Sequence, residues 1–504
     1  MESEGELKAT ASPRGEGVCS ESESIIDVFS KFPDQISHHI VSFLTVTDLT
    51  RFGCVSKRCR ELCLSSPKLN FDGFSLANTS TCYYRLKLLS YLDRFFFHRG
   101  DSRIQSFRVR WFKHEEYKLE EYEGEEPPCF CGRDCYEGTR MFTWIQNAVR
   151  CKVEVLDLET DVSDSDELEP LPSCVFQCET LRYLVLHVDW MILRTPSFTF
   201  PSNLKYLELK KIVIENEGFF KWISCCCKCI EELNLREVHG IETMTIKSSS
   251  MKKLRFSGFS VDLCHINISC EKLEGLFVCW YFASASNKSL NIFAPNLKHL
   301  KWVGNMVKHP NLGKFECLAD AALSVNSLGD DKYNVFEVRD TLCRAKSLIL
   351  DEATIKDNFR GGSRPAPLYD TFCLGMGIDS FVDELIPAIV FLLRGMPNLF
   401  NLLLMNYNLP LEAPESNTSG VDIEYWKLQN LAFVYQLRQV TIELCNGSNG
   451  IEFAKYVLEC APNLEKMVIV YLPQDLEKVA RKLEKSKISN AAAAVFFQEK
   501  PIKR

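Results

Sequence analysis

The side chains best suited to chemistry in this chain are its cysteines, of which the sequence holds 23. Cys129, Cys131 and Cys135 form a C-x-C-x3-C run within an acidic segment. Zinc sites usually have four ligands in paired C-x2-C to C-x4-C or H-x3-H to H-x5-H spacing, and no fourth ligand follows nearby. We interpret the segment as a solvated insertion, and metal binding is the alternative.

A second group, Cys225, Cys226, Cys227 and Cys229, is adjacent rather than spaced for chelation, which favours packing as small apolar side chains. The total number of cysteines is odd, and they are scattered among apolar patterns. This usage is typical of reduced thiols, so we predict no metal site and a cytoplasmic or nuclear location.

Catalysis by a cysteine would require a base and a positioned anion hole, and the sequence pairs neither with any thiol. His38 and His39 fall in an expected helix, where we interpret them as solvated or facing a partner. The glutamates between Glu115 and Glu126 are most simply a solvated loop. No glycine-rich phosphate loop, H-E-x-x-H or G-x-S-x-G motif is present. We therefore predict no catalytic residues and no cofactor; a thiol enzyme is the least favoured reading.

The elements that could position a binding site are repeated strands, with apolar residues at the first, fourth and sixth positions of each unit. Seven units start 21 to 28 residues apart, which is the period of leucine-rich repeats. Weaker strands at Ile241 to Ile246 and Leu263 to Ile268 indicate a departure from uniform packing. We predict an α/β fold, in which parallel strands stack with helices and loops outside them. The seven units are Val153/Leu156/Leu158, Leu181/Leu184/Leu186, Leu204/Leu207/Leu209, Ile230/Leu233/Leu235, Met251/Leu254/Phe256, Leu273/Leu276/Val278 and Leu297/Leu300/Trp302.

Two more strand cores follow, Ala345/Leu348/Leu350 and Leu399/Leu402/Leu404, each after an apolar helical stretch, Val335 to Cys343 and Phe381 to Arg394. The phrase Pro-Asn-Leu recurs at 295, 397 and 462, where we expect turns with local asparagine-to-backbone bonds. The tail predicts a helix over 475–485 and a last strand over 491–497.

Ahead of the repeats, residues 32 to 62 predict three short helices. Pro33 suits a first helical turn, Thr47 is the expected N-cap of the second helix, and Ser56 that of the third. So small a unit cannot bury both sides of its apolar stripes, so we expect a partner to cover part of them.

This segment resembles an F-box, through Phe32-Pro33-Asp34, Ser42-Phe43-Leu44, Asp48-Leu49 and Val55-Ser56-Lys57-Arg58. The resemblance implies docking on a Skp-family adaptor and, through it, a cullin. Many family members have tryptophan where this chain has Cys59, and the lost aromatic area predicts weaker adaptor affinity. The residues implied to face or support the adaptor are Pro33, Ile36, Ile40, Leu44, Leu49, Val55 and Cys59.

Later segments are similar to plant F-box/leucine-rich-repeat proteins with a C-terminal FBD module: a helix with Leu86, Leu89, Leu92 and Phe96, and the run from Leu437 to Met467 with its Gly-Ser-Asn-Gly turn at 447 to 450. We expect a disordered acidic tail over 1–24, an F-box over 25–75, a solenoid over 76–400 and an FBD-like module over 401–500. The resemblance implies the substrate-recognition subunit of an SCF-type E3 ubiquitin ligase. The alternative is a non-ligase scaffold whose F-box has lost adaptor binding.

Strand alternation predicts where a target would bind, because residues between the inward leucines face the opposite way. Those outward residues include Asp157, Val185, Glu232 and Lys253. Phe277 between Arg255 and Lys301 is the most interface-like group, since aromatic and arginine side chains dominate binding energy; alternatively, Phe277 packs under a loop. The candidate target-binding residues are Tyr206, Glu208, Asn234, Arg255, Phe277, His299 and Lys301.

Composition sets limits on the partners. The chain has 504 residues, 46% of them hydrophobic, and a formal net charge of −8. No clustered basic face is evident, which argues against a nucleic-acid partner. The longest apolar stretch, Leu385 to Leu393, is too short to span a bilayer, so we expect no membrane partner.

Overall fold

The computed structural model describes residues 31–71, 82–112, 137–160, 170–189, 191–199, 201–258, 262–326, 341–360, 367–379, 381–406, 421–444, 449–471, 483, 489 and 493–499. Several predictions concern other residues. The acidic tail, the glutamate-rich loop with Cys129, Cys131 and Cys135, the turn at 447 and 448, the helix expected from Val335, and most of the helix over 475–485 lie outside the described residues.

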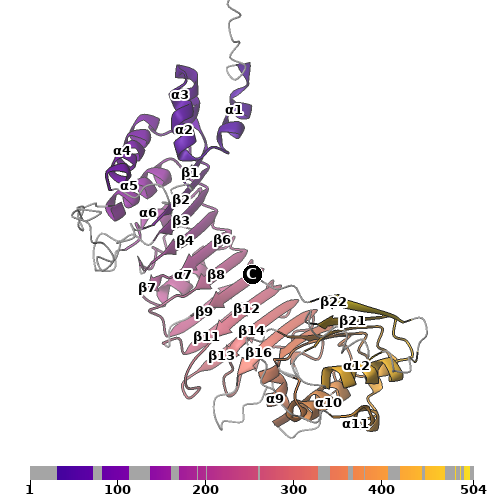
Figure 1. Cartoon of the computed structure of the whole chain (residues 1–504). Coiled ribbons are helices and arrows are strands. Elements are labelled where there is room, and N and C mark those ends of the chain that lie inside the picture. The colour runs from indigo at the N-terminus through magenta and orange to yellow at the C-terminus, as the bar shows by residue number, and fades with distance from the viewer. Residues whose placement is uncertain are drawn as a thin grey trace, which may run out of the picture.

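One parallel sheet runs the length of the molecule, and its described part has 16 strands in the order of the chain (Figure 1). Each strand hydrogen-bonds to the next in an unbroken register, including the step from β19 to β20, where Leu402 pairs with Val440. The strands are β1 Lys68–Phe71, β2 Ser106–Trp111, β3 Val155–Thr160, β4 Tyr183–Val188, β6 Tyr206–Lys210, β8 Glu232–Arg236, β10 Lys253–Ser257, β12 Gly275–Trp280, β14 His299–Asn305, β16 Asp320–Asn326, β17 Ser347–Asp351, β18 Cys373–Gly377, β19 Asn401–Met405, β20 Gln439–Glu443, β21 Lys466–Tyr471 and β22 Ala494–Glu499.

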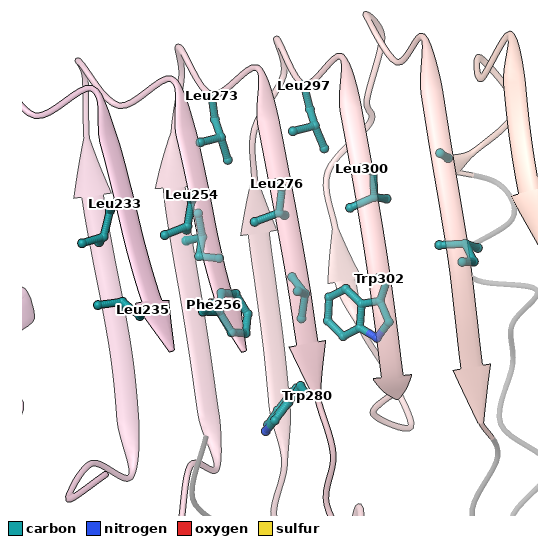
Figure 2. Close-up of a cluster of buried hydrophobic side chains, with 14 of the residues drawn as sticks. Leu233, Leu235, Leu254, Phe256, Leu273, Leu276, Trp280, Leu297, Leu300 and Trp302 are labelled. Carbon is teal, nitrogen blue, oxygen red and sulfur yellow. The ribbon is translucent and has the colours of Figure 1, made fainter. Parts of the chain in front are cut away.

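The inward residues of these strands form columns of buried side chains. All seven predicted repeat units are buried, and Leu233, Leu254, Leu276 and Leu300 stand beside one another in register. Figure 2 shows these columns for the middle repeats. Each of these leucines stands beside the equivalent residue of the neighbouring repeat, and repeats of this kind bury their apolar face by stacking.

A second parallel sheet closes the core behind the middle repeats. Its strands are β9 Thr243–Ser248, β11 His265–Cys270, β13 Ser289–Phe293 and β15 Asn311–Leu312. The weak strands expected near Ile246 and Ile268 are β9 and β11, so the predicted departure from uniform packing is confirmed as a sheet-on-sheet core. A short pair, β5 Ile192–Leu193 and β7 Val213–Ile214, precedes it.

Helices cover the core at the two ends of the molecule, as Figure 1 shows. Toward the N-terminus these are α1 Asp34–Val41, α2 Val46–Gly53, α3 Lys57–Ser65, α4 Cys82–Arg99, α5 Glu137–Arg150, α6 Cys174–Gln177 and α7 Gly218–Cys226. Toward the C-terminus they are α9 Glu352–Arg360, η5 Asp383–Leu385, α10 Ile386–Arg394, α11 Ile423–Leu428, η6 Ala432–Tyr435 and α12 Asn449–Cys460.

The Pro-Asn-Leu turns connect consecutive repeats. Asn296, Asn398 and Asn463 each donate a side-chain hydrogen bond to a backbone carbonyl of the preceding repeat, at 2.8, 2.9 and 2.7 Å. The sequence predicted hydrogen bonds to the nearby backbone, and this prediction was wrong. The donor and acceptor residues are 25 to 29 positions apart in the sequence. The turns therefore fix register between repeats as well as direction.

Among the strands missed from the sequence, β16 and β18 show why. In β16 the repeat pattern is Leu318, Ala321 and Leu323, and a small alanine stands where the other units have a large residue. In β18 the inward Leu374 and Met376 alternate with Gly375 and Gly377, and glycine is depleted in strands.

Candidate functional site

The first candidate surface is the N-terminal helix group. Thr45 is the N-cap of α2, where its side chain accepts a hydrogen bond from the Asp48 amide at 3.3 Å, so the prediction of Thr47 was wrong by two residues. The Ser56 cap of α3 is confirmed, with the Cys59 amide 3.0 Å from its hydroxyl. His38 Nε2 lies 2.9 Å from the Ser65 hydroxyl and so connects α1 to α3.

Apolar side chains remain exposed on this group and form what we call the apolar ridge. Phe43 is 74% exposed and Val55 is 75% exposed. The α1 members recur at helical spacing, so they form one stripe. Sequence reasoning left Phe32 and Phe43 out of the adaptor set, although the same spacing includes them. The apolar ridge consists of Phe32, Ile36, Ile40, Phe43 and Val55.

The predicted adaptor residues thus divide by position. Pro33, Ile36, Ile40 and Val55 are exposed, and Leu44 is partly buried against the core. Leu49 is only 4% exposed and Cys59 only 3%, so they support the helix group from within. Because Cys59 is buried, the size of residue 59 affects packing inside the helix group. The smaller side chain at this position therefore gives no direct reason to expect weaker adaptor affinity.

The second candidate surface is the outward face of the long sheet, which we call the open face. Its central row runs across the strands in hydrogen-bonded register, from Asp157 through Val185, Glu208, Asn234, Arg255 and Phe277 to Lys301. The predicted row is therefore adjacent in space, strand by strand. Neighbouring strands lie about 4.8 Å apart, so side chains of consecutive residues in the row can touch.

Three of the predicted residues form a polar cluster around Glu208. His187 Nε2 lies 3.1 Å from Oε1 of Glu208, the Tyr206 hydroxyl donates to Oε2, and the Asn234 amide donates to the Tyr206 oxygen at 2.8 Å. Arg236 approaches the same carboxylate at 3.6 Å. Sequence reasoning missed His187 and Arg236, which stand one outward position further along their strands.

This cluster shifts the acidity of its members. The hydrogen bond from His187, helped by those from Tyr206 and by the charge of Arg236, holds the pKa of Glu208 at about 2. Burial, followed by the bond to Glu208, raises the pKa of Tyr206 to about 12. Because the Glu208 carboxylate is already well bonded, we interpret the cluster as a structural support of the open face.

The other predicted group surrounds the ring of Phe277. The guanidinium carbon of Arg255 lies 5.2 Å from the ring centroid, and Nζ of Lys301 lies 5.5 Å from it. Phe277 is half-buried between these two exposed cations. The ring thus packs between cations rather than under a described loop. His299 stands on the adjacent row, with its Nδ1 2.8 Å from Oδ2 of Asp320.

The second sheet carries a shallow cavity of about 260 Å³ on its outer face, which the sequence did not reveal. Its floor is a register row of Thr245, Asn267, Asn291 and Asn311. The Asn291 amide donates to Asn267 at 2.7 Å, and the Asn267 amide donates to Thr245 at 3.3 Å. The asparagine at the equivalent position of β11 and β13, Asn267 and Asn291, was the available sequence signal.

Several cysteines in the described part of the chain are buried thiols. In the 225–229 group, Cys226 and Cys227 are buried, whereas Cys225 and Cys229 are exposed, so packing explains only half of that group. Burial raises the pKa of Cys227 to about 12 and that of Cys270 to about 11, which disfavours the nucleophilic thiolate. Among the described residues, no group of His, Cys, Asp or Glu is arranged to hold a metal ion.

Comparison with known proteins identifies two kinds of domain in this chain. Residues 29–71 match the F-box domain, and residues 141–327 match the LRR repeats of FBD-associated F-box protein At5g56370. The chain therefore carries an F-box domain followed by leucine-rich repeats of the kind found in FBD-associated F-box proteins. The F-box match covers α1 to β1, and the repeat match contains all seven candidate target-binding residues of the open face.

Relatives in Arabidopsis thaliana extend the similarity of this F-box/LRR protein over nearly its whole length. F-box/LRR-repeat protein At3g59210 is 24% identical over 91% of this chain and 91% of its own length. Putative F-box/FBD/LRR-repeat protein At5g22610 is 22% identical over 90% of this chain and 85% of its own length. F-box/LRR-repeat protein At3g59190 is 26% identical over 63% of this chain and 72% of its own length.

These matches carry general expectations for an F-box/LRR protein. F-box domains in general bind Skp-type adaptors, and F-box/LRR proteins are in general non-catalytic adaptors. Within the residues described, no helix is both long and apolar enough to cross a membrane.

Proposed function

We propose that this F-box/LRR protein is the substrate-recognition subunit of an SCF-type cullin-RING E3 ubiquitin ligase. One observation carries the proposal: an F-box with an exposed apolar ridge is joined by β1 to a long sheet whose open face is free of covering helices in the described residues. The ridge offers a docking surface for a Skp-family adaptor and, through it, a cullin, and the open face offers one for a target protein.

The proposed mechanism is proximity. The adaptor holds the F-box, the open face holds the target, and a ubiquitin-charged enzyme elsewhere in the complex meets a target lysine at high effective concentration. No bond chemistry is assigned to this chain. The proposal places the protein in the cytoplasm or nucleus, with an F-box over 25–75, a solenoid over 76–400 and an FBD-like module over 401–500.

The deciding experiment uses a double substitution on the ridge, Ile36→Asp with Ile40→Asp. Both side chains are exposed, so folding should survive, whereas charges buried against the adaptor without partners should cost about 2 kcal/mol or more, roughly thirtyfold in affinity. Leu44 and Leu49 are less suitable, because they pack inside the helix group. The measurement is the amount of a plant Skp-type adaptor and cullin that co-purify with each variant.

The matched control is Phe97→Asp, which introduces a charge at an apolar residue that is 82% exposed on α4, outside the F-box match. It should leave adaptor binding unchanged. If the adaptor fails to bind the wild-type chain, the scaffold alternative replaces the ligase proposal. If it binds the ridge variant at wild-type level, the ridge is not the docking site.

A further inference from the structure

The charges on three neighbouring strands of the open face are of one sign. We call the outward residues of β10, β12 and β14, up to Val303, the basic window. They include three lysine or arginine side chains and one histidine, and no carboxylate. In order they are Lys253, Arg255 and Ser257, then Gly275, Phe277 and Cys279, then His299, Lys301 and Val303.

Two cations of the basic window have no carboxylate partner in the described chain. Lys253 pairs with Glu232 of β8 at 2.7 Å, and His299 pairs with Asp320 of β16 at 2.8 Å. Arg255 and Lys301 take part in no ion pair among the described residues, and each contacts the Phe277 ring instead.

The N-terminal part of the open face is arranged differently. Arg108 pairs with Asp157 at 2.5 Å, and Arg110 pairs with Glu159 at 2.9 Å. Arg236 lies 3.6 Å from the well-bonded Glu208. A charged side chain that already forms an ion pair within the protein adds little to the binding of a partner. Binding would only replace the internal ion pair with an ion pair to that partner. Arg255 and Lys301, beside Phe277, are therefore two positive charges that remain available for an external partner.

An apolar patch follows the basic window along the same row. Lys301 pairs in register with Ala322 of β16, and Ala322 pairs with Ile349 of β17, which is exposed. Arg255 and Lys301 are two strands apart, and so are Lys301 and Ile349. At 4.8 Å per strand, each of these separations is about 10 Å. This equals about three residues of a polyproline II chain, in which every third side chain faces the same way.

We propose that the target of the open face presents an acidic segment in polyproline II conformation, of the form acid-x-x-acid-x-x-apolar, in either chain direction. One carboxylate pairs with Arg255 and the next with Lys301, the residues between them cross Phe277, and the apolar side chain contacts Ile349. This inference rests on the proposed function only for the statement that the bound segment belongs to a ligase target. The binding of the segment itself rests on charge complementarity. A chain with net charge −8 repels such a segment elsewhere, which directs it to the basic window.

The probe is a fluorescently labelled synthetic peptide, Glu-x-x-Glu-x-x-Leu with glycine and serine at x, titrated with the full chain and read by anisotropy. Matched peptides replace both Glu by Gln, by Lys or by phosphoserine, or place the two Glu side by side. We expect the spaced Glu peptide to bind about tenfold or more tightly than the Gln and Lys peptides, and to weaken as salt is raised.

The protein variants are Arg255→Ala with Lys301→Ala, and the control Lys252→Ala with Lys298→Ala. The control removes the same net charge just before the same two strands, but from cations that pair with Glu231 at 2.8 Å and with Glu274 at 3.1 Å. The first variant should lose about tenfold in peptide affinity, the control should stay within about twofold, and both should keep the wild-type melting temperature.

Equal binding of the Glu and Gln peptides, an equal loss in the control variant, or binding of the phosphoserine peptide alone would each overturn the proposal of a carboxylate-bearing target. Adaptor co-purification is measured on the same preparations. Peptide binding without adaptor binding would overturn only the ligase role, and adaptor binding without peptide binding would overturn only the acidic target.

Discussion

At the scale of single residues, the open face carries two kinds of charged side chain. One kind is bonded within the protein and supports the fold, and the other remains available to a binding partner. Glu208 belongs to the first kind, because four side chains bond to its carboxylate or approach it. Arg255 belongs to the second kind, since its described contact is the ring of Phe277. Both stood in the same predicted row, and sequence alone could not distinguish them, because the distinction depends on which side chain the next strand brings alongside.

Glu208 should make stability depend on acidity. Its pKa in the folded state is about 2, below the ordinary value of 4.5, so its stabilising contribution is present above pH 4.5 and is lost as the pH falls toward 2. We expect Glu208→Gln to lower the melting temperature near pH 6, and the difference from wild type to shrink between pH 5 and pH 2. Thermal unfolding across this range measures it. A difference that does not change with pH would contradict the assigned role.

At the scale of elements, backbone contacts between neighbouring strands restrict which side chains a strand can carry. Gly304, near the end of β14, has φ +108°, and a Cβ there would lie 2.3 Å from the carbonyl oxygen of Trp280. Gly275, at the start of β12, has only the Lys253 side chain nearby, at 3.7 Å from an added Cβ. The backbone contact at Gly304 therefore leaves no room for a side chain, whereas the surroundings of Gly275 leave room for one.

Alanine substitutions should separate these two glycines. Gly304→Ala forces a backbone shift and a left-handed residue, so we expect a loss of about 1–3 kcal/mol in the free energy of unfolding. Gly275→Ala, its matched control, should be neutral or slightly stabilising, because glycine is a poor strand former. Denaturant unfolding of both variants gives the comparison, and similar losses would show that the close approach to Trp280 is not limiting.

The elements were predictable wherever repeat positions carry large apolar residues. The units from Leu181 to Trp302 were identified because burial and strand period coincide in them. The sequence could not show that β9 and β11 form a separate sheet, because their pattern is that of any half-buried strand. It also could not show which way Leu49 and Cys59 point, since three short helices allow several packings.

At the scale of the whole molecule, the stacking of repeats predicts how far the effect of a core substitution extends along the sheet. Leu254 is buried in β10 and packs between Leu233 and Leu276. Leu254→Ala should cost about 2–5 kcal/mol and should speed amide hydrogen exchange in β8, β10 and β12 more than in β3 or β20, because each repeat contacts mainly its neighbours. Exchange measured by mass spectrometry tests this.

The control for that experiment is Arg255→Ala, at the outward position next to Leu254 on the same strand. It removes no inward packing, so exchange should stay near the wild-type rate. Uniform acceleration throughout the sheet in the Leu254 variant would show instead that the array unfolds as one unit.

Strand β1 lies within the F-box match and is also the first strand of the long sheet, where Leu69 pairs with Phe107 of β2. Strand β1 therefore connects the F-box directly to the sheet of the repeats. The basic window is centred on β12, seven strand spacings from β1, or about 34 Å. In a ligase receptor, the sheet would fix the distance between the adaptor and a target bound at the basic window. The position of a target lysine relative to the bound segment would then decide whether ubiquitin reaches it. Adding one repeat between β1 and β10 would shift that offset by about 5 Å, and with it the choice of lysine.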